Sequence, residues 1–278
     1  MANQFAGDRL HLNQEEINTL ERGNIMTSSN AAPVAIVTGG ARGIGRACAL
    51  SLAKSGLDVA LVDLLEAELF RTADEIKACG RRALTFQSDV VRKKEADRVV
   101  GEVVAQWGRV DVLVNNAGKG MPKGIFEITE AEFDHTIALN LKSCFNYIQA
   151  VAPVMRRQGN GRIVSMSSLN AHSGGVTAAV SRFAYAAAKA GIIGMTRALA
   201  KELGPEILIN AVCPGIIETE VGNALTRARG PAIADAGIAL KRMGKPDDVA
   251  ELVTFLATSN PCFITGQDIV VDGFQFNR

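Results

Sequence analysis

Short runs of apolar residues alternate with longer amphipathic stretches from residue 33 to the end of the chain. The first run, Val34–Thr38, is apolar almost throughout and leads into glycines, which is typical of a strand buried on both faces of a parallel sheet. A strand followed by a helix, repeated in this way, folds as parallel strands joined by right-handed crossovers. The pattern predicts an α/β fold: a Rossmann-like, doubly wound parallel sheet of seven strands flanked by helices, in a single domain.

The expected elements follow one another with short connections. Strands are expected at 34–38, 57–62, 82–87, 110–114, 162–166, 207–212 and 269–271. Helices are expected at 43–55, 65–79, 92–107, 130–157 with Thr129 as N-cap, 183–203, and 247–258 after Pro246. Residues 216–245 show no clear element. Because ligands bind beyond the carboxyl ends of strands in such sheets, we expect this segment to be a lid over a substrate.

The amino-terminal segment differs from the rest of the chain. Residues 1–32 are polar and carry several acidic side chains where a signal peptide would have an apolar stretch. We expect 1–32 to be an extension outside the fold and 33–278 to be the domain. Met26 is an alternative start.

Charge and cysteine usage exclude several classes of protein. Thirty Lys and Arg stand against 29 Asp and Glu, a balance that argues against a nucleic-acid binder. No apolar run reaches the roughly 20 residues of a membrane span. The five cysteines and the histidines at 11, 135 and 172 are scattered, without disulfide or metal-site spacing. We therefore expect a cytoplasmic protein with reduced thiols and no protein-bound catalytic metal.

A glycine-rich turn follows the first strand. Thr38–Gly45 reads T-G-G-A-R-G-I-G and leads directly into a predicted helix. Glycines let the backbone approach a pyrophosphate, and the helix offers unpaired N–H groups and a favourable dipole there. The spacing differs from the general G-x-G-x-x-G fingerprint, and a tight turn without a ligand is the alternative interpretation.

Asp63 ends the second strand, 18 residues after Gly45. An acid at this place accepts hydrogen bonds from the ribose hydroxyls of NAD and repels the 2′-phosphate of NADP. A turn or helix-capping aspartate is the alternative. Arg42 could reach a 2′-phosphate or the pyrophosphate instead. We favour NAD because Leu64 and Leu65, rather than a cation, follow Asp63.

Tyr185 and Lys189 lie four residues apart, which places them on one face of a helix. An ammonium close to a phenol stabilises the phenolate. A tyrosine in that position can exchange a proton with an alcohol or carbonyl oxygen. Ser168, at the end of the fifth strand, can hydrogen-bond the same oxygen. The Tyr–Lys pair alone occurs by chance on many helices.

From about residue 33 to 273 the chain resembles the short-chain dehydrogenase/reductase family. The motifs that match, in family order, are Thr38–Gly45, Asp89-Val90, Asn115–Gly118, Asn140, Ser168, Tyr185-x-x-x-Lys189, Pro214-Gly215-x-x-x-Thr219 and Gly266 through Asp272-Gly273. So many motifs in order make coincidence negligible.

The resemblance implies a role for each matching residue. It makes Tyr185 the general acid/base and Lys189 the group that stabilises its phenolate and binds the nicotinamide ribose. It makes Ser168 the residue that polarises the substrate oxygen, and Asn140 the holder of a water in the proton relay. Substrate would contact Ser168 and Tyr185. The implied cofactor contacts are Gly39, Arg42, Gly43, Ile44, Gly45, Asp63, Asp89, Val90, Asn116, Ala117, Gly118, Tyr185, Lys189, Pro214, Gly215, Ile217 and Thr219.

The implied function is hydride transfer between NAD and a secondary alcohol or ketone, with polyols, sugars, hydroxysteroids and small alcohols all open as substrates. An NADPH-dependent 3-oxoacyl reductase is the alternative enzyme. A catalytically silent cofactor-binding regulatory or scaffold protein is the alternative of another class.

Two departures from the family pattern concern the substrate. The segment between Ser168 and Tyr185 is longer than usual, and Phe274 stands where the family has a second glycine. His172 lies in the longer segment, either as a surface residue or in contact with substrate. Asn115 either binds neighbouring strands or contacts the cofactor.

The helix at 183–203 carries many small residues, so that another helix can approach it closely. The helix at 247–258 offers Val249, Leu252, Val253 and Leu256, more apolar surface than one sheet face needs. Members of the family usually pair these helices across two-fold axes. We therefore expect a homotetramer.

Overall fold

The computed structural model describes residues 31–175, 181–220 and 224–275. Within these ranges, everything from Pro33 onward belongs to one compact unit. The expected extension at 1–32 lies almost wholly outside the described residues, so its separation from the fold stays a prediction.

Seven parallel strands form one sheet in the order β3-β2-β1-β4-β5-β6-β7. Their bounds are β1 Val34–Thr38, β2 Asp58–Asp63, β3 Ala83–Gln87, β4 Val112–Asn115, β5 Gly161–Met166, β6 Ile207–Pro214 and β7 Asp268–Val271. The sheet grows outward from β1 to β3, and then the chain returns to place β4 on the other side of β1. The predicted doubly wound fold is confirmed, and its topological switch point lies between β1 and β4.

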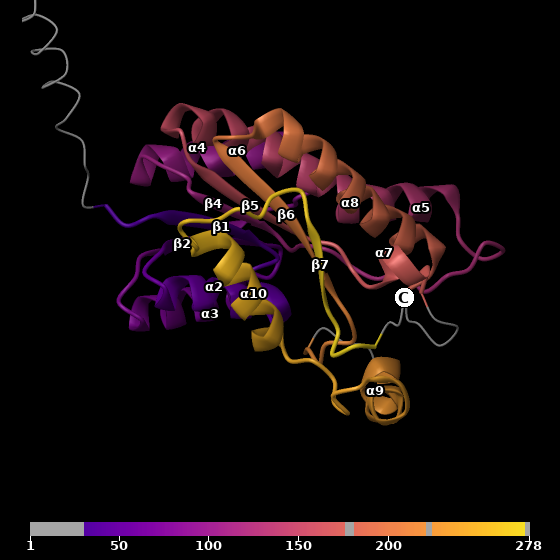
Figure 1. Cartoon of the computed structure of the whole chain (residues 1–278). Helices are drawn as coiled ribbons and strands as arrows, with labels where there is room; N and C mark the ends of the chain where they lie inside the picture. The colour runs from indigo at the N-terminus through magenta and orange to yellow at the C-terminus, as the bar shows by residue number, and fades with distance from the viewer. Residues whose placement is uncertain (1–30, 176–180, 221–223, 276–278) are drawn as a thin grey trace, which may run out of the picture. The chain divides into compact units, whose positions relative to one another are not determined.

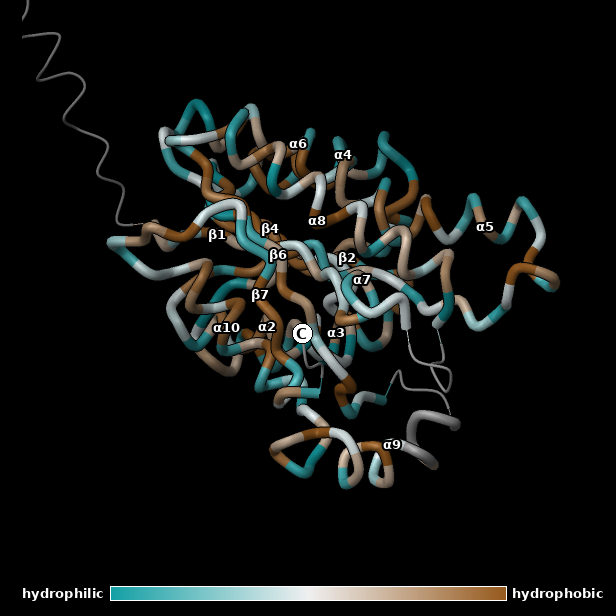
Figure 2. Tube along the Cα trace, turned by 45° about the vertical axis from the view of Figure 1, so that its right-hand side comes forward, coloured by the Kyte–Doolittle hydropathy of each residue, from teal (hydrophilic) through white to brown (hydrophobic). Residues whose placement is uncertain are grey.

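Two layers of helices cover the sheet (Figure 1). One layer holds α2 Gly43–Lys54, α3 Glu66–Ala78 and α10 Pro246–Thr258; the other holds α4 Lys93–Trp107, α6 Ser143–Gln158 and α8 Phe183–Leu203. Alternate strand residues serve the two layers: Ala35 and Val37 pack on the first, Val34 and Ile36 on the second. Figure 2 shows the hydrophobic residues gathered along the central strands.

The helix expected at 130–157 is interrupted. Thr129 caps α5 (Glu130–Ile137) as predicted, since its hydroxyl accepts from Glu132 N at 3.3 Å and Glu132 accepts from Thr129 N at 3.0 Å. A π-helical turn, η1 (Ala138–Lys142), then precedes α6. A π turn adds one residue to the helical repeat and often marks a functional site. The turn contains Asn140.

The segment 216–245, which shows no clear element in the sequence, contains a helix. Helix α9 spans Ala224–Gly237 within this segment. A further single helical turn, α7 (Asn170–Ser173), lies earlier in the chain, between β5 and α8. Gly230 and Pro231 stand inside α9. Such residues usually mark a break, and their small apolar neighbours give no clear helical stripe.

Of the four residues expected to give α10 surplus apolar surface, three are buried and Leu252 is partly buried, whereas Phe255 of the same helix is half exposed. Val249, Val253 and Leu256 are buried in the chain's own core. Helix α10 packs against α2 as well as against the sheet, so that its apolar stripe is covered from two sides.

The amino ends of the strands are fixed by buried carboxylates. Asp58 accepts from Arg81 Nη2 at 2.7 Å, Arg82 Nε at 2.7 Å and Arg82 N at 2.9 Å. Burial alone would raise the pKa of Asp58, but these bonds outweigh burial and lower it. Asp111 likewise accepts from Val34 N at 2.8 Å. Both groups lie at the edge opposite to the carboxyl ends.

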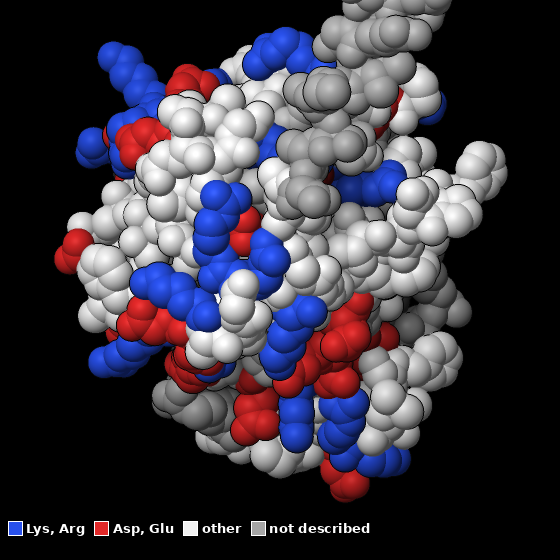
Figure 3. All heavy atoms as spheres, turned by 90° about the vertical axis from the view of Figure 1, so that its left-hand side faces the viewer, with Lys and Arg blue, Asp and Glu red and all other residues white. Residues whose placement is uncertain are grey.

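Basic and acidic side chains are interspersed on the face that Figure 3 shows. Among the residues described, no helix combines the length and apolar character that a membrane crossing requires.

We predict that Asp58→Asn lowers the free energy of unfolding at pH 7 by about 2–3 kcal/mol, because two guanidinium groups lose a buried partner. The folded-state pKa of Asp58 is lowered, so its contribution is present above the unfolded pKa of about 3.9. The difference between wild type and variant should shrink as pH falls through the folded-state pKa. Urea denaturation from pH 7 to pH 3 measures it.

Asp74→Asn is the matched control. Asp74 pairs with Lys77 at 3.0 Å, but its side chain is 74% exposed. Its replacement should change stability by less than about 0.5 kcal/mol. Equal losses in the two variants would contradict the role given to the Asp58 cluster.

Candidate active site

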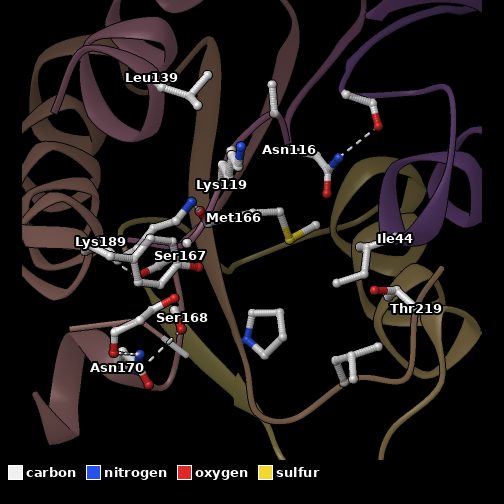
Figure 4. A pocket seen from close by; sticks show the side chains of 18 of the residues that line it. Ile44, Asn116, Lys119, Leu139, Met166, Ser167, Ser168, Asn170, Lys189 and Thr219 are labelled. Atoms are coloured by element: carbon white, nitrogen blue, oxygen red, sulfur yellow. Dashed lines mark hydrogen bonds between the residues drawn. The ribbon is translucent and has the colours of Figure 1, made fainter. Parts of the chain in front are cut away.

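A cavity of about 820 Å³ opens at the carboxyl ends of the strands, beside the switch point between β1 and β4. Figure 4 shows its labelled side chains on two sides: Lys189, Ser167 and Ser168 face Ile44 and Thr219. Cavities of this size hold cofactors and substrates.

The glycine-rich turn forms one end of the cavity. Gly39, Arg42 and Ile44 line it, and α2 begins directly behind them without a side-chain cap. The first N–H groups of a helix have no partner within the helix, so they are open to an anion. Gly43 and Gly45 do not line the cavity: a Cβ on Gly45 would lie 2.0 Å from Gly39 O. Gly45 is needed for the close packing of the turn.

Asp63 holds the turn that follows β2. Its Oδ1 accepts from Leu64 N at 2.7 Å and Leu65 N at 3.2 Å, and its Oδ2 accepts from Ala41 N at 3.2 Å. It is thus a turn acceptor that also lines the cavity. Within the described ranges no basic side chain forms an ion pair with it. Arg42 lines the same end and is exposed.

Asn116 ties β4 to the glycine turn. Its amide donates to Thr38 O at 3.1 Å and to Gly39 O at 3.0 Å, while its backbone N–H donates to Thr38 Oγ1 at 3.0 Å. The side chain also lines the cavity. Asn115, by contrast, donates to Ser165 Oγ at 3.3 Å and is buried in the sheet. Of its two interpretations, the structure favours the one that binds a neighbouring strand.

Lys189 is a buried ammonium group at the cavity wall. The residue is 3% exposed, and Nζ donates to Met166 O, at the end of β5, at 2.6 Å. Nζ also lies 5.6 Å from the centre of the Tyr185 ring. No carboxylate among the described residues pairs with this charge. The positive charge of Lys189 therefore acts on Tyr185 and on the cavity without a paired carboxylate to neutralise it.

Ser168 presents a hydroxyl to the cavity beside this pair. Its Oγ accepts from Asn170 N at 3.2 Å, which leaves the hydroxyl proton available to a ligand oxygen. Tyr185 and Ser168 are both half-buried.

Asn140 lies behind the cavity wall and does not line it. The residue is fully buried, its Oδ1 accepts from Lys119 N at 3.1 Å, and its Nδ2 donates to Lys119 O at 3.0 Å and Thr136 O at 3.0 Å. These bonds fix the backbone that follows Gly118. A Cβ on Gly118 would lie 2.7 Å from Asn140 Oδ1 and 3.4 Å from Lys189 Nζ.

The residues predicted from the sequence make up about half of the cavity lining. The further predicted residues that line the cavity are Asp89, Val90, Ala117, Pro214, Gly215, Ile217 and Thr219. Those missed include Ser88, Lys119, Leu139, Asn170, Ser173, Ser181, Ile216, Ile233 and Gln275. Some directly adjoin predicted motifs, a signal that could have found them. Others come from α7 and α9, which the sequence pattern did not predict.

Neither interpretation of His172 holds. Its side chain is largely buried and does not line the cavity, and its Nε2 lies 3.1 Å from Asp268 Oδ2.

Comparison with known proteins gives concordant matches over most of the chain. The family model described as enoyl-(acyl carrier protein) reductase matches residues 39–273. A 3-oxoacyl-acyl-carrier-protein reductase of Staphylococcus epidermidis is 41% identical over 87% of this chain and 98% of its own length. A (2S)-((R)-hydroxy(phenyl)methyl)succinyl-CoA dehydrogenase subunit of Thauera aromatica is 38% identical over 86% of this chain and 95% of its own.

A solved structure agrees with these sequence matches. It is a short-chain dehydrogenase/reductase of Brucella melitensis, named for glucose/ribitol dehydrogenase, with a TM-score of 0.81 and 31% identity. The match covers 88% of this chain and 97% of that one.

We predict that Gly118→Ala destabilises the protein by about 1–3 kcal/mol, because the added methyl group overpacks the space beside Asn140 and Lys189. Gly101→Ala is the control, since Gly101 lies on α4 with no atom within 4 Å of the added Cβ. There the same change should stabilise by about 0.5–1 kcal/mol. Denaturant titration measures the free energy of unfolding of both variants. Stabilisation by Gly118→Ala would contradict the predicted overpacking.

Proposed function

The chain belongs to the short-chain dehydrogenase/reductase family of oxidoreductases, and we propose that it transfers hydride between NAD and a secondary alcohol or ketone. One observation carries the proposal. A single cavity joins Ser168, Tyr185 and the buried ammonium of Lys189 to the uncapped amino end of α2.

The cavity lining fits a nicotinamide dinucleotide. The free N–H groups at the start of α2 suit a pyrophosphate, and Asp63 suits ribose hydroxyls. Asp89 and Val90 line the part assigned to adenine, and Pro214 and Thr219 the part assigned to the nicotinamide. The bound cofactor supplies the hydride donor or acceptor.

The protein's own residues handle the proton. The positive charge of Lys189, whose Nζ lies 5.6 Å from the centre of the Tyr185 ring, attracts negative charge that develops on the tyrosine oxygen during proton transfer. In alcohol oxidation the Tyr185 phenolate takes the hydroxyl proton, and in ketone reduction the phenol returns a proton to the oxygen. Ser168 donates a hydrogen bond to the same oxygen and stabilises charge that develops on it.

We predict that Tyr185→Phe lowers kcat about 100-fold or more and leaves the Kd for NAD largely unchanged, because the lost hydroxyl serves proton transfer. Lys189→Met should lower both turnover and cofactor affinity. Lys201→Met, at the exposed end of the same helix, is the control and should change neither. Steady-state kinetics and cofactor titration measure both constants, and near-wild-type turnover of Tyr185→Phe would refute the assigned proton transfer.

The choice of NAD rests on Asp63. Its carboxylate lines the cavity and has no ion-pair partner among the described residues, so its charge disfavours a 2′-phosphate. Arg42, at the same end, acts in the opposite direction.

We predict that kcat/KM for NAD exceeds that for NADP at least tenfold, about 1.4 kcal/mol. Asp63→Ala should reduce this ratio, and Arg42→Ala should increase it. A tenfold preference of the wild type for NADP, lost in Arg42→Ala, would show that Arg42 outweighs Asp63.

A 3-oxoacyl thioester is the second candidate substrate. The Staphylococcus relative is named as a 3-oxoacyl reductase and the Thauera relative as a dehydrogenase of an acyl-CoA. Both names describe acyl chains carried on a thiol. Assays with secondary alcohols, polyols and 3-oxoacyl thioesters, each with NAD(H) and NADP(H), distinguish the candidates. Cofactor binding without turnover on the whole panel would favour the catalytically silent alternative.

We place the enzyme in the cytoplasm, with a small molecule rather than a nucleic acid or a membrane as its partner. All five cysteines are free thiols, which persist in a reducing compartment.

Exposed surfaces on two sides support assembly into a homotetramer. Helix α8 exposes small residues, and the neighbouring helix α6 exposes Phe145 at 45%. Phe255 on α10 is 50% exposed, and Phe263 beyond it is fully exposed. Small side chains allow close helix packing, and closed two-fold contacts commonly combine into tetramers.

We predict that light scattering gives four times the 29.4 kDa of one chain. Gly194→Glu should reduce the assembly to dimers, because no atom of the chain lies within 4 Å of an added Cβ and the new charge would face the proposed partner helix. Gly101→Glu on α4, equally open, is the control. A monomeric wild type would contradict the proposal.

A further inference from the structure

Three possible metal ligands meet outside the cavity. They are His172 of α7, Cys213 of β6 and Asp268 at the start of β7, and their ligand atoms all lie within 4.8 Å of one another. His172 Nε2 and Asp268 Oδ2 are 3.1 Å apart. None of the three lines the cavity.

The fold brings these distant residues together. In the register of β6 and β7, Ala211 stands beside Asp268 and Cys213 beside Val270. Because side chains alternate along a strand, Cys213 and Asp268 project from the same face of the sheet. Helix α7 packs against α8 (Figure 1), and there it brings His172 to Asp268.

The chemistry of the cluster suits a zinc-class cation. Imidazole nitrogen, thiolate sulfur and carboxylate oxygen bind Zn²⁺ at about 2.0–2.3 Å, so neighbouring ligand atoms of a tetrahedral site lie about 3.3–3.7 Å apart. The His172–Asp268 separation is already close to this spacing. Arg197 Nη2 donates to the other carboxylate oxygen, Oδ1, at 2.6 Å. Such an outer partner orients a ligating carboxylate and leaves Oδ2 for the ion.

We propose that His172, Cys213 and Asp268 bind one zinc-class divalent cation per chain, with a water in the fourth position. The thiolate and the carboxylate together offset the two charges of the ion. His172 follows Ser168 by four residues, and Cys213 directly precedes Pro214. A bound ion therefore links the two segments that border the substrate side of the cavity.

Binding must release the thiol proton. Burial raises the pKa of Cys213 to about 11, and the charge of Asp268 adds to this effect, while a contact with Ser167 opposes it. A cation that binds Cys213 as a thiolate displaces the thiol proton. The charged groups around the site include Asp268, Arg197 and Lys189.

Titration of the tag-free full chain with Co²⁺ tests the proposal without any need for turnover. We expect one equivalent to bind, with thiolate-to-cobalt charge-transfer absorption, and Zn²⁺ to displace it. Cys213→Ser should abolish the absorption, and His172→Ala should weaken binding at least tenfold. Cys79→Ser removes an exposed thiol and should change nothing.

Absence of the charge-transfer band in folded wild-type protein overturns the proposal, as does a band lost in Cys79→Ser but kept in Cys213→Ser. Thermal unfolding provides a second measurement if Cys213→Ser folds poorly. Zn²⁺ should raise the Tm of the wild type but not that of His172→Ala or Asp268→Asn. Equal shifts in all three proteins would equally refute the site.

Discussion

The hydrogen bond from the buried Lys189 ammonium to Met166 O is the interaction on which the site depends. It fixes the start of α8 to the carboxyl end of β5, and so places Tyr185 beside Ser168 in one cavity. The charge has no carboxylate partner within the described ranges, so it acts on whatever enters the cavity. It also acts on the protein itself: burial raises the pKa of the Cys144 thiol, and the Lys189 charge opposes that rise.

The two edges of the sheet have different tasks. At the amino edge, Asp58 and Asp111 hold strand starts through charged hydrogen bonds, which contribute stability away from any ligand. At the carboxyl edge, Asn116 and Asn140 bind backbone groups and so hold open a cavity that side chains do not fill. The side-chain amides of these two asparagines form hydrogen bonds with backbone groups. Lys189, Tyr185 and Ser168 therefore remain to contact substrate and cofactor.

The sequence predicts those parts of the fold in which buried apolar residues follow a regular pattern along the chain. The parallel strands are continuous apolar runs, and the helix at 183–203 was placed with both ends correct. Helix α9 was missed because Gly230 and Pro231 interrupt its pattern, and η1 because it lies inside one long helical run and no residue type marks a π turn. The cluster of His172, Cys213 and Asp268 was invisible because the register of β6 and β7, rather than spacing along the chain, brings it together.

A deuterium-transfer experiment most directly tests the claim that hydride moves between a secondary alcohol and a nicotinamide in this cavity. The full chain would be incubated with NAD and secondary alcohols or 3-hydroxyacyl thioesters that carry deuterium on the carbinol carbon. Mass spectrometry of the reduced cofactor should show one deuterium gained per turnover for at least one alcohol. Cofactor that is reduced without label, or that binds but stays oxidised with every alcohol, would contradict it.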